Sequence, residues 1–155
     1  MPMLDVTIPK EALSREAEAA LLSKLTDLLI LHEGADPSNA KVRQMAWVFL
    51  HRPEAVYVAG KQAEAPRYRL TVSVPQGQFD DSRRASMVKA LTDAVLDAEE
   101  GKYPRDPFRV WVFPNEVPEG NWGAEGKIWK LADIAQVVVG DRAKAEEYAR
   151  RRLNA

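Results

Sequence analysis

The residue best suited to chemistry is Pro2, which follows the first methionine of the sequence. Removal of Met1, the usual processing when the second residue is small, would leave Pro2 with a free secondary amine. An unperturbed α-amino group has a pKa of about 8, and burial in an apolar pocket lowers that pKa because it disfavours the charged form. A general base works best when its pKa lies near the operating pH. The sequence therefore offers Pro2 as a candidate base, although a single proline is more often only structural.

The residues around Pro2 predict the first elements of a β-α-β unit. Leu4, Val6 and Ile8 alternate with polar residues, as the buried face of a strand does. Ser14 then offers an N-cap hydroxyl for a helix that runs to about His32. The apolar stripe of this helix consists of Ala17, Leu21, Leu25, Leu28 and Leu29. A second strand is expected over 45–50, and a short apolar stretch follows at 56–58.

The same order of elements starts again at Tyr68. An alternating strand over 68–74 precedes a helix with Asp80 as N-cap, and a further strand is expected over 109–113. Short sequence matches link the two halves in order, with offsets of 66 residues (25 to 91), 64 (47 to 111) and 65 (53 to 118). They are Leu-Thr-Asp at 25–27 and 91–93, Trp-Val-Phe at 47–49 and 111–113, and Pro-Glu at 53–54 and 118–119. At an offset of 65, Trp122 also takes the place of Tyr57. The pattern indicates an internal duplication.

Two such units side by side predict an α+β fold: a four-stranded mixed sheet with two helices on one face, plus a C-terminal helix. We expect a single domain over 1–155, made of a first unit at 1–66, a second unit at 67–133 and a C-terminal helix extension at 134–155. The charge-rich segment 141–153 is typical of a surface helix. The second face of the sheet, which carries large apolar side chains such as Trp47 or Trp111, would need a cover, and other copies of the chain are its natural source.

Composition excludes several classes of function. The net charge of −1 argues against binding to nucleic acid or to a membrane surface. The chain has no cysteine, and its two histidines, His32 and His51, lack the spacing of a metal motif. No apolar run is long enough to span a bilayer, and charged residues interrupt any signal-peptide core. We therefore expect a cytoplasmic, soluble protein without metal, cofactor, nucleic-acid partner or membrane partner.

With these elements in place, the chain resembles the tautomerase superfamily, whose members use an amino-terminal proline on a β-α-β unit. Relatives like 4-oxalocrotonate tautomerase carry one unit, and the fused type, similar to cis-3-chloroacrylic acid dehalogenase and malonate semialdehyde decarboxylase, carries two. The resemblance covers about residues 2–133. It rests on Pro2, on the strand 110–113 followed by Glu-Val-Pro at 116–118, and on the turn 120–123 with Gly126. It implies catalysis by Pro2, an apolar wall at Trp122, a small-molecule organic acid as substrate and a homotrimer.

The chain departs from the dehalogenase branch at most of that branch's functional positions. Two arginines that bind the substrate carboxylate there correspond to Pro75 and Gln78, and a helix histidine corresponds to Leu29. A tyrosine of the last main strand corresponds to Phe113, and the water-activating glutamate corresponds to Ala124, one step before Glu125. The one-unit tautomerases carry an arginine after their first strand, where this chain has Lys10 and Leu13. Only the proline and the turn are therefore carried over.

Other side chains are candidates for binding the substrate. Arg67 and Arg69 flank the start of the second unit's first strand, where either would serve as an anion clamp or as a solubilising charge on an edge strand. Asn121 and Glu125 would polarise a carbonyl group or a water molecule, or would simply satisfy their own turn. The candidate site consists of Pro2 as the catalytic residue, with Trp122, Asn121, Arg69, Arg67, Phe113 and Glu125 as binding residues and Arg43 as a weaker candidate.

Two hypotheses of different classes follow. The first is a tautomerase, in which Pro2 as a neutral amine moves a proton between the enol and keto forms of a small 2-oxo or dienoate acid. A decarboxylase, hydratase or dehalogenase would use the same amine. The second is a catalytically silent trimeric homologue with a binding or structural role, and the absence of a clear substrate-binding cation favours it.

Overall fold

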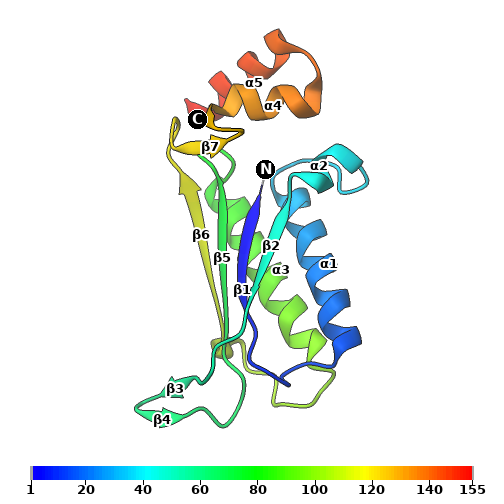
Figure 1. The fold of residues 1–155 in the computed structure, drawn as a ribbon, viewed down its shortest axis with the longest axis vertical. Helices are drawn as coiled ribbons and strands as arrows, with labels where there is room; N and C mark the ends of the chain where they lie inside the picture. The colour runs from blue at the N-terminus through cyan, green and yellow to red at the C-terminus, as the bar shows by residue number, and fades with distance from the viewer. Residues whose placement is uncertain (1, 155) are drawn as a thin grey trace.

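The computed structural model describes residues 2–154, and two strand–helix–strand units form its body (Figure 1). The first unit contains β1 (Met3–Thr7), α1 (Arg15–His32), α2 (Ala40–Gln44), β2 (Trp47–His51), β3 (Tyr57–Val58) and β4 (Lys61–Gln62). The second contains β5 (Tyr68–Pro75), α3 (Asp81–Ala98), the short 3-10 helix η1 (Pro107–Arg109), β6 (Val110–Val117), β7 (Trp122–Ala124) and β8 (Lys127–Trp129). Two further helices follow, α4 (Leu131–Val139) and α5 (Arg142–Leu153).

The main sheet is four-stranded and mixed, as the sequence predicted. Its strand order is β2-β1-β5-β6, with parallel pairs within each unit and one antiparallel pair, β1 with β5, between the units. The small pairs β3–β4 and β7–β8 form hairpin arms outside this sheet. No described helix is both long and apolar enough to cross a membrane.

Both long helices cover one face of the sheet, and the core lies between them and the strands (Figure 1). Alternation decides which strand residues enter the core: Leu4, Val6 and Ile8 are fully buried from the first unit, and Leu70 and Val72 from the second. The predicted N-caps are confirmed, because Ser14 accepts a hydrogen bond from the Ala17 amide and Asp80 from that of Arg83.

The duplication extends to the register of the strands. Met3 pairs with Trp47 in the first unit, and Arg69 pairs with Trp111 in the second. Since Trp47 and Trp111 are equivalent, Met3 is equivalent to Arg69. Counting back one residue makes Pro2 equivalent to Tyr68, and both are buried.

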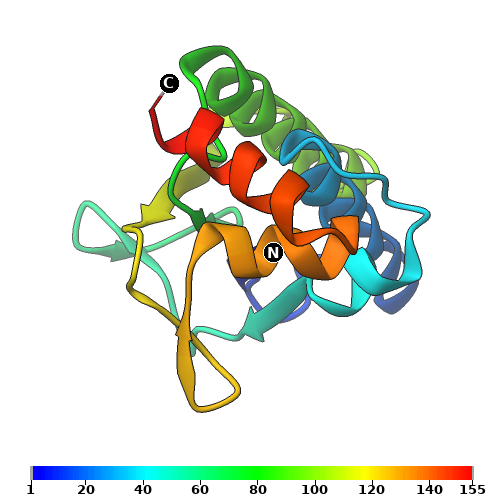
Figure 2. The ribbon, with the colours of Figure 1, turned by 90° about the horizontal axis from the view of Figure 1, so that it is seen from above.

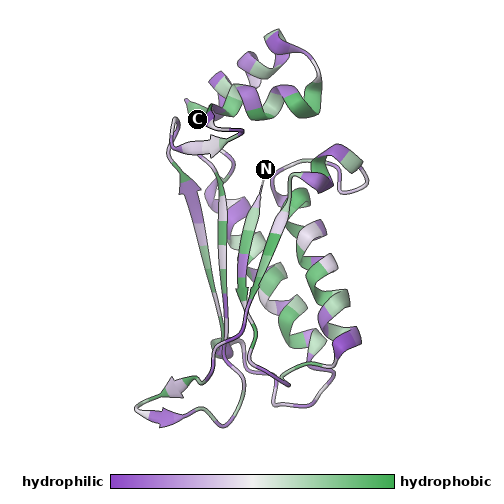
Figure 3. Cartoon of the chain, in the orientation of Figure 1, coloured by the Kyte–Doolittle hydropathy of each residue, from purple (hydrophilic) through white to green (hydrophobic). Residues whose placement is uncertain are grey.

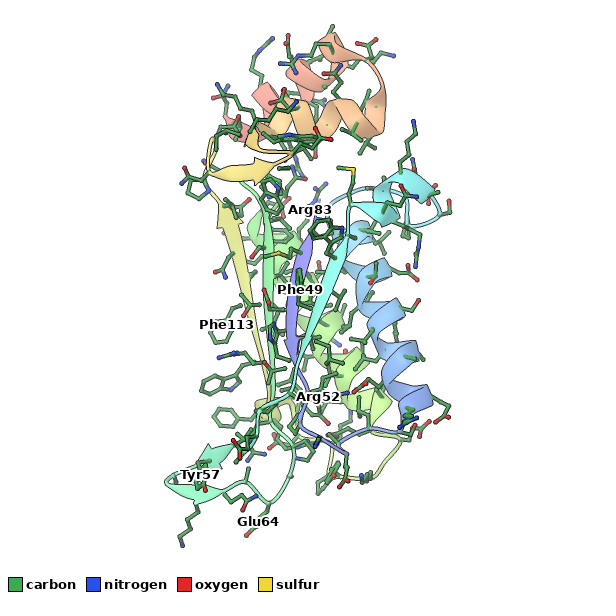
Figure 4. All side chains as sticks on the ribbon, viewed as in Figure 1. Phe49, Arg52, Tyr57, Glu64, Arg83 and Phe113 are labelled. Atoms are coloured by element: carbon green, nitrogen blue, oxygen red, sulfur yellow. The ribbon has the colours of Figure 1, made fainter. Side chains whose placement is uncertain are left out.

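The other face of the sheet is open and aromatic. Trp47 is 63% exposed and Trp111 56%, and each packs edge-to-face with the phenylalanine two residues further along its strand, at 6.4 Å between ring centroids. Phe113 points away from the helices (Figure 4). A single chain thus leaves a row of large apolar side chains in contact with water.

The end of the chain differs from the sequence-based expectation of a single helix. α4 and α5 pack on each other, and Gly140, with a φ of 74°, separates them in the left-handed conformation that favours glycine. Arg142 at the start of α5 donates to Asp133 of α4 at 2.6 Å. Figure 3 shows that α4 is largely apolar, whereas α5 carries the alternating charges that predict a surface helix. Both helices lie over the end of the sheet at which the chain begins (Figure 2).

Two smaller differences have local causes. Residues 45–46, expected to begin a strand, instead follow the short helix α2, whose N-cap Asn39 accepts from the amides of Lys41 and Val42. The last strand, expected over 109–113, runs on to Val117 through Pro114. Proline is tolerated there because β6 is an edge strand, which pairs only with β5.

Candidate functional site

The candidate site lies at the end of the sheet where β1 begins. β1 and β2 start at this end, β5 and β6 finish there, and the C-terminal end of α1 and the helix α2 stand beside them (Figure 1). α4 and α5 cover it from above (Figure 2). Both units therefore contribute to the site, and α4 and α5, called the roof below, cover it.

Pro2 is buried immediately before β1. Its carbonyl oxygen accepts a hydrogen bond from the Trp47 amide at 3.2 Å, which continues the parallel pairing of β1 with β2 by one residue. The next residues of β1 are fixed on both sides, by β2 and by β5. The backbone of Pro2 is thus joined to the sheet through its carbonyl group.

A pocket of about 180 Å³ opens between this end of the sheet and the roof. Its wall is mostly apolar, and its polar side chains are those of Glu33, Gln78 and Tyr148. No lysine or arginine is among the described residues that line it. The apolar lining consists of Ala35, which follows α1, Val42 and Met45 from the α2 region, and Leu131, Ile134, Ala135, Val138 and Val139 from α4.

Glu33 caps the C-terminal end of α1 and is only 6% exposed. Burial raises the pKa of its carboxyl group, and the positive charge of the amino terminus, together with a hydrogen bond from it, partly offsets that rise. Gly34, with a φ of 83°, then turns the chain away from the helix. Sequence reasoning missed Glu33, although its offset of 66 residues from Glu99 matches that of the repeated Leu-Thr-Asp.

Gln78 and Tyr148 tie the roof to the body of the molecule. The Tyr148 hydroxyl donates to Oε1 of Gln78 at 3.0 Å, and Nη2 of Arg152 donates to the Gln78 carbonyl at 3.0 Å. Gln78 is itself buried. At a position where the resemblance implies an arginine, this chain therefore has a neutral amide that is already bonded to α5.

The predicted turn residues lie on the arm β7–β8. Trp122 is half-buried at the start of β7, in register with Trp129, and belongs to the Pro2 end of the sheet without lining the pocket. Asn121 and Glu125 are exposed, and the Glu125 carboxylate lies 3.8 Å from Nζ of Lys127. The glycine beside Asn121, Gly120, needs its left-handed φ of 87° for the turn, and open space, not a close backbone, surrounds it.

The predicted arginines lie elsewhere in the single chain. Arg69 pairs in register with Thr7, five residues or about 17 Å along β1 from Pro2. Both Arg67 and Arg69 line a different cavity, of about 500 Å³, together with Thr7 and Trp111. Tyr57, also part of its lining, marks this opposite end in Figure 4.

The two remaining candidates also lie outside the pocket. Arg43 donates to Asp27 and, at 3.2 Å, to the Pro37 carbonyl, so it is engaged within the first unit. Phe113 is 42% exposed on the open face of the sheet, in register with Thr71. Of the side chains proposed from the sequence, the structure therefore places only Pro2 and Trp122 at this end of the sheet, and neither is among the residues that line the pocket.

Comparisons with known proteins agree with the fold. Residues 70–132 match the family model of the tautomerase enzymes. No curated protein matches the sequence. Among solved structures, the chain superposes on the wild-type symmetric trimer of Q0 fused 4-OT with a TM-score of 0.64 at 24% identity, covering 81% of this chain and 93% of that one.

Two further structures show the same fold. N1, a member of the cis-3-chloroacrylic acid dehalogenase family, matches with a TM-score of 0.67 at 20% identity, over 94% of this chain and 96% of that one. Pt0534 inactivated by 2-oxo-3-pentynoate matches with a TM-score of 0.65 at 21% identity, over 81% and 94%. The resemblance in fold to the fused, two-unit type is confirmed.

Proposed function

For this chain, a fused-type protein with the tautomerase-superfamily fold, we propose that Pro2 is a catalytic general base, exposed as a free amine by removal of Met1. In this proposal it interconverts the enol and keto forms of a small 2-oxo or dienoate acid. The observation that carries the proposal is the burial of Pro2 at the end of the sheet where the pocket under α4 lies, with its carbonyl bonded to β2. The backbone amide of Trp47 also lies two residues after Met45, which lines that pocket. Proton transfer to and from a bound substrate requires a positioned amine close to the substrate.

The pocket supplies two of the conditions for this chemistry. Its lining is mostly aliphatic, and desolvation against such a wall lowers the pKa of an amine towards neutrality. Gln78, from the β5–α3 loop, and Tyr148, from α5, add hydrogen-bonding groups to the lining. Because the Tyr148 hydroxyl already donates to Gln78, the Gln78 amide NH₂ is the neutral donor of this pair that we propose stabilises a developing enolate oxygen.

No lysine or arginine is among the described residues that line the pocket, so we propose that a cation for the substrate carboxylate comes from another copy of the chain. Arg69 is exposed on the open face of the sheet, as Phe113 is, and both lie away from the pocket of their own chain. We propose that Arg67 or Arg69 and Phe113 reach the Pro2 pocket of a neighbouring copy, with Trp122 and its neighbours Asn121 and Glu125 closing it. This placement makes the assembled protein the active form.

The assay of choice is ketonisation of a 2-hydroxydienoate, with 2-oxo-3-pentynoate as a covalent probe. An unprotonated secondary amine adds to the activated alkyne to form a C–N bond, and the proton moves to carbon. We expect one adduct per chain by intact mass, on Pro2 by peptide mapping, and loss of activity in step with labelling. Labelling of a lysine alone, with activity retained, would contradict the assignment of Pro2.

We expect the protein to be a homotrimer in solution, since Trp47, Phe49, Trp111 and Phe113 leave an apolar aromatic face uncovered. Light scattering at micromolar concentration should give about three times the mass of the chain. Trp111→Lys, which places a charge on this face without touching the core, should shift the mass towards the monomer. A wild-type protein that is monomeric under these conditions would contradict both the trimer and the shared site.

The alternative of a silent homologue has one observation in its favour, the absence of lysine and arginine from the described lining of the pocket. A decarboxylase, hydratase or dehalogenase would need groups that activate water or bind carboxylate, and Pro75, Gln78 and Ala124 stand at the corresponding positions. Covalent labelling of Pro2 without turnover of any enol substrate would favour the silent homologue.

A further inference from the structure

Each unit buries one glutamate at the C-terminal end of its long helix. Glu33 caps α1 and is 6% exposed, and Glu99 caps α3 and is 4% exposed. The two lie 66 residues apart, the same offset that relates Met3 to Arg69 in the sheet. They therefore occupy equivalent places in the duplicated fold. A buried carboxylate is costly unless a cation or hydrogen-bond donors accompany it.

In the second unit these companions are side chains. Arg109 grips Glu99 with two hydrogen bonds, from Nη1 at 2.6 Å and from Nη2 at 2.5 Å, and the Tyr68 hydroxyl donates to the same carboxylate at 2.8 Å. Arg109 is 3% exposed and Tyr68 is 2% exposed, so the cluster is closed to water. The Glu99 carboxylate therefore has both a cation and a hydroxyl donor from side chains of its own unit.

The first unit has different residues at the positions equivalent to Arg109 and Tyr68. The strand register puts Met45 at the place of Arg109 and Pro2 at the place of Tyr68. Neither side chain carries a charge or a hydrogen-bond donor, and Met45 lines the pocket together with Glu33. The positive charge of the amino terminus acts on the Glu33 carboxyl and favours its ionised form.

We propose that Glu33 is the counter-ion of the Pro2 amine, and that carboxylate and amine share one proton in the resting enzyme. Removal of Met1 moves the amine by one residue, or about 3.3 Å, along the line of β1, which keeps it at this end of the pocket. Glu33 is then a positioning residue, which acts on the reaction by setting the charge of Pro2. The inference rests on the proposed role of Pro2.

Two effects oppose each other in this pair. The apolar wall lowers the pKa of the amine, and an ionised Glu33 raises it, because a nearby negative charge favours the ammonium form. The other polar groups around Glu33 are Gln78 and Tyr148, which are bonded to each other. Arg83 also lies close, with its guanidinium beside Gly34 and its Nε 3.6 Å from the Asp80 carboxylate. Figure 4 shows Arg83 at this same end of the molecule.

The test is Glu33→Gln in protein shown by intact mass to begin at Pro2. The pKa of the Pro2 amine is read from the ¹⁵N chemical shift of proline-labelled protein. With the carboxylate gone, only desolvation remains, and the pKa should fall by about one unit or more, a shift of about tenfold. The acid limb of the kcat/KM profile should move by the same amount to lower pH. An unchanged amine pKa in folded Glu33→Gln protein would overturn the proposal.

Two further variants sharpen the result. Glu16→Gln makes the same substitution at an exposed site in the first turn of α1, about 25 Å along the helix from Glu33, and should leave the amine pKa unchanged. Met45→Arg gives the first unit the cation of the second, which should bind Glu33 and lower the amine pKa even if Glu33→Gln does not fold. An amine pKa that shifts as expected in protein without turnover would support the ion pair and contradict the proposed tautomerase.

Discussion

Protein that retains Met1 is expected to show no tautomerase activity above background. In the retained form the nitrogen of Pro2 is a tertiary amide, which has no affinity for a proton near neutral pH, and the new amine sits one residue further out. General base catalysis contributes about 10²- to 10⁴-fold, so kcat/KM should fall by at least about a hundredfold. The measurement is the initial rate of enol ketonisation, with intact mass to establish the fraction of processed chains.

The control for this result is a variant that keeps a terminal amine. Pro2→Ala, processed by the same removal of Met1, presents a primary amine at the same backbone position and should retain partial activity. The substitution leaves Leu4, Val6 and Ile8 in the core, so the unfolding midpoint should stay close to that of the wild type. Equal turnover by processed and Met1-retaining protein would remove Pro2 from the mechanism.

The fold was predictable because its signals are local and written twice. Alternation at Leu4, Val6 and Ile8 predicts the first strand, and Ser14 and Asp80 predict where the two long helices begin. The repeated segments indicate that a second unit of the same kind follows the first. The division of the C-terminal helix extension into α4 and α5 was not predicted, because a single glycine, Gly140, does not by itself show whether a helix continues or ends. The packing of α4 on α5 over the pocket favours the break.

The site was less predictable than the fold, because it depends on how the two units pair. The repeat places Arg67 and Arg69 next to the counterpart of Pro2, and the antiparallel pairing of β1 with β5 then moves that counterpart to the opposite end of the sheet. In the sequence alone, Glu33 looks like an ordinary charged residue at the end of a helix. Its role becomes visible only when the register shows that Met45 and Pro2 stand where the second unit has Arg109 and Tyr68.

The second large effect is expected on stability, at the buried cluster of the second unit. Arg109→Met gives this unit the residue of the first and leaves Glu99 buried without its cation, although the Tyr68 hydroxyl stays within reach. Breaking one partner of a buried ion pair typically costs about 3–5 kcal/mol of unfolding free energy. For a chain of this length each kcal/mol lowers Tm by about 2–4 °C, so Tm should fall by roughly 6–20 °C. Urea unfolding gives the free energy directly.

The matched control removes both charges. Arg109→Met with Glu99→Gln replaces the ion pair by neutral groups, and the Tyr68 hydroxyl can still donate to the new amide oxygen, so much of the lost stability should return. In the first unit, Met45 stands at the position of Arg109, so Glu33→Gln leaves no buried arginine without its partner. We therefore expect it to destabilise the protein less than Arg109→Met does. If Arg109→Met alone cost less than about 1 kcal/mol, the carboxylate of Glu99 would be tolerated without a cation. By the same physics, a buried Glu33 would then not need the amine of Pro2 as its counter-ion.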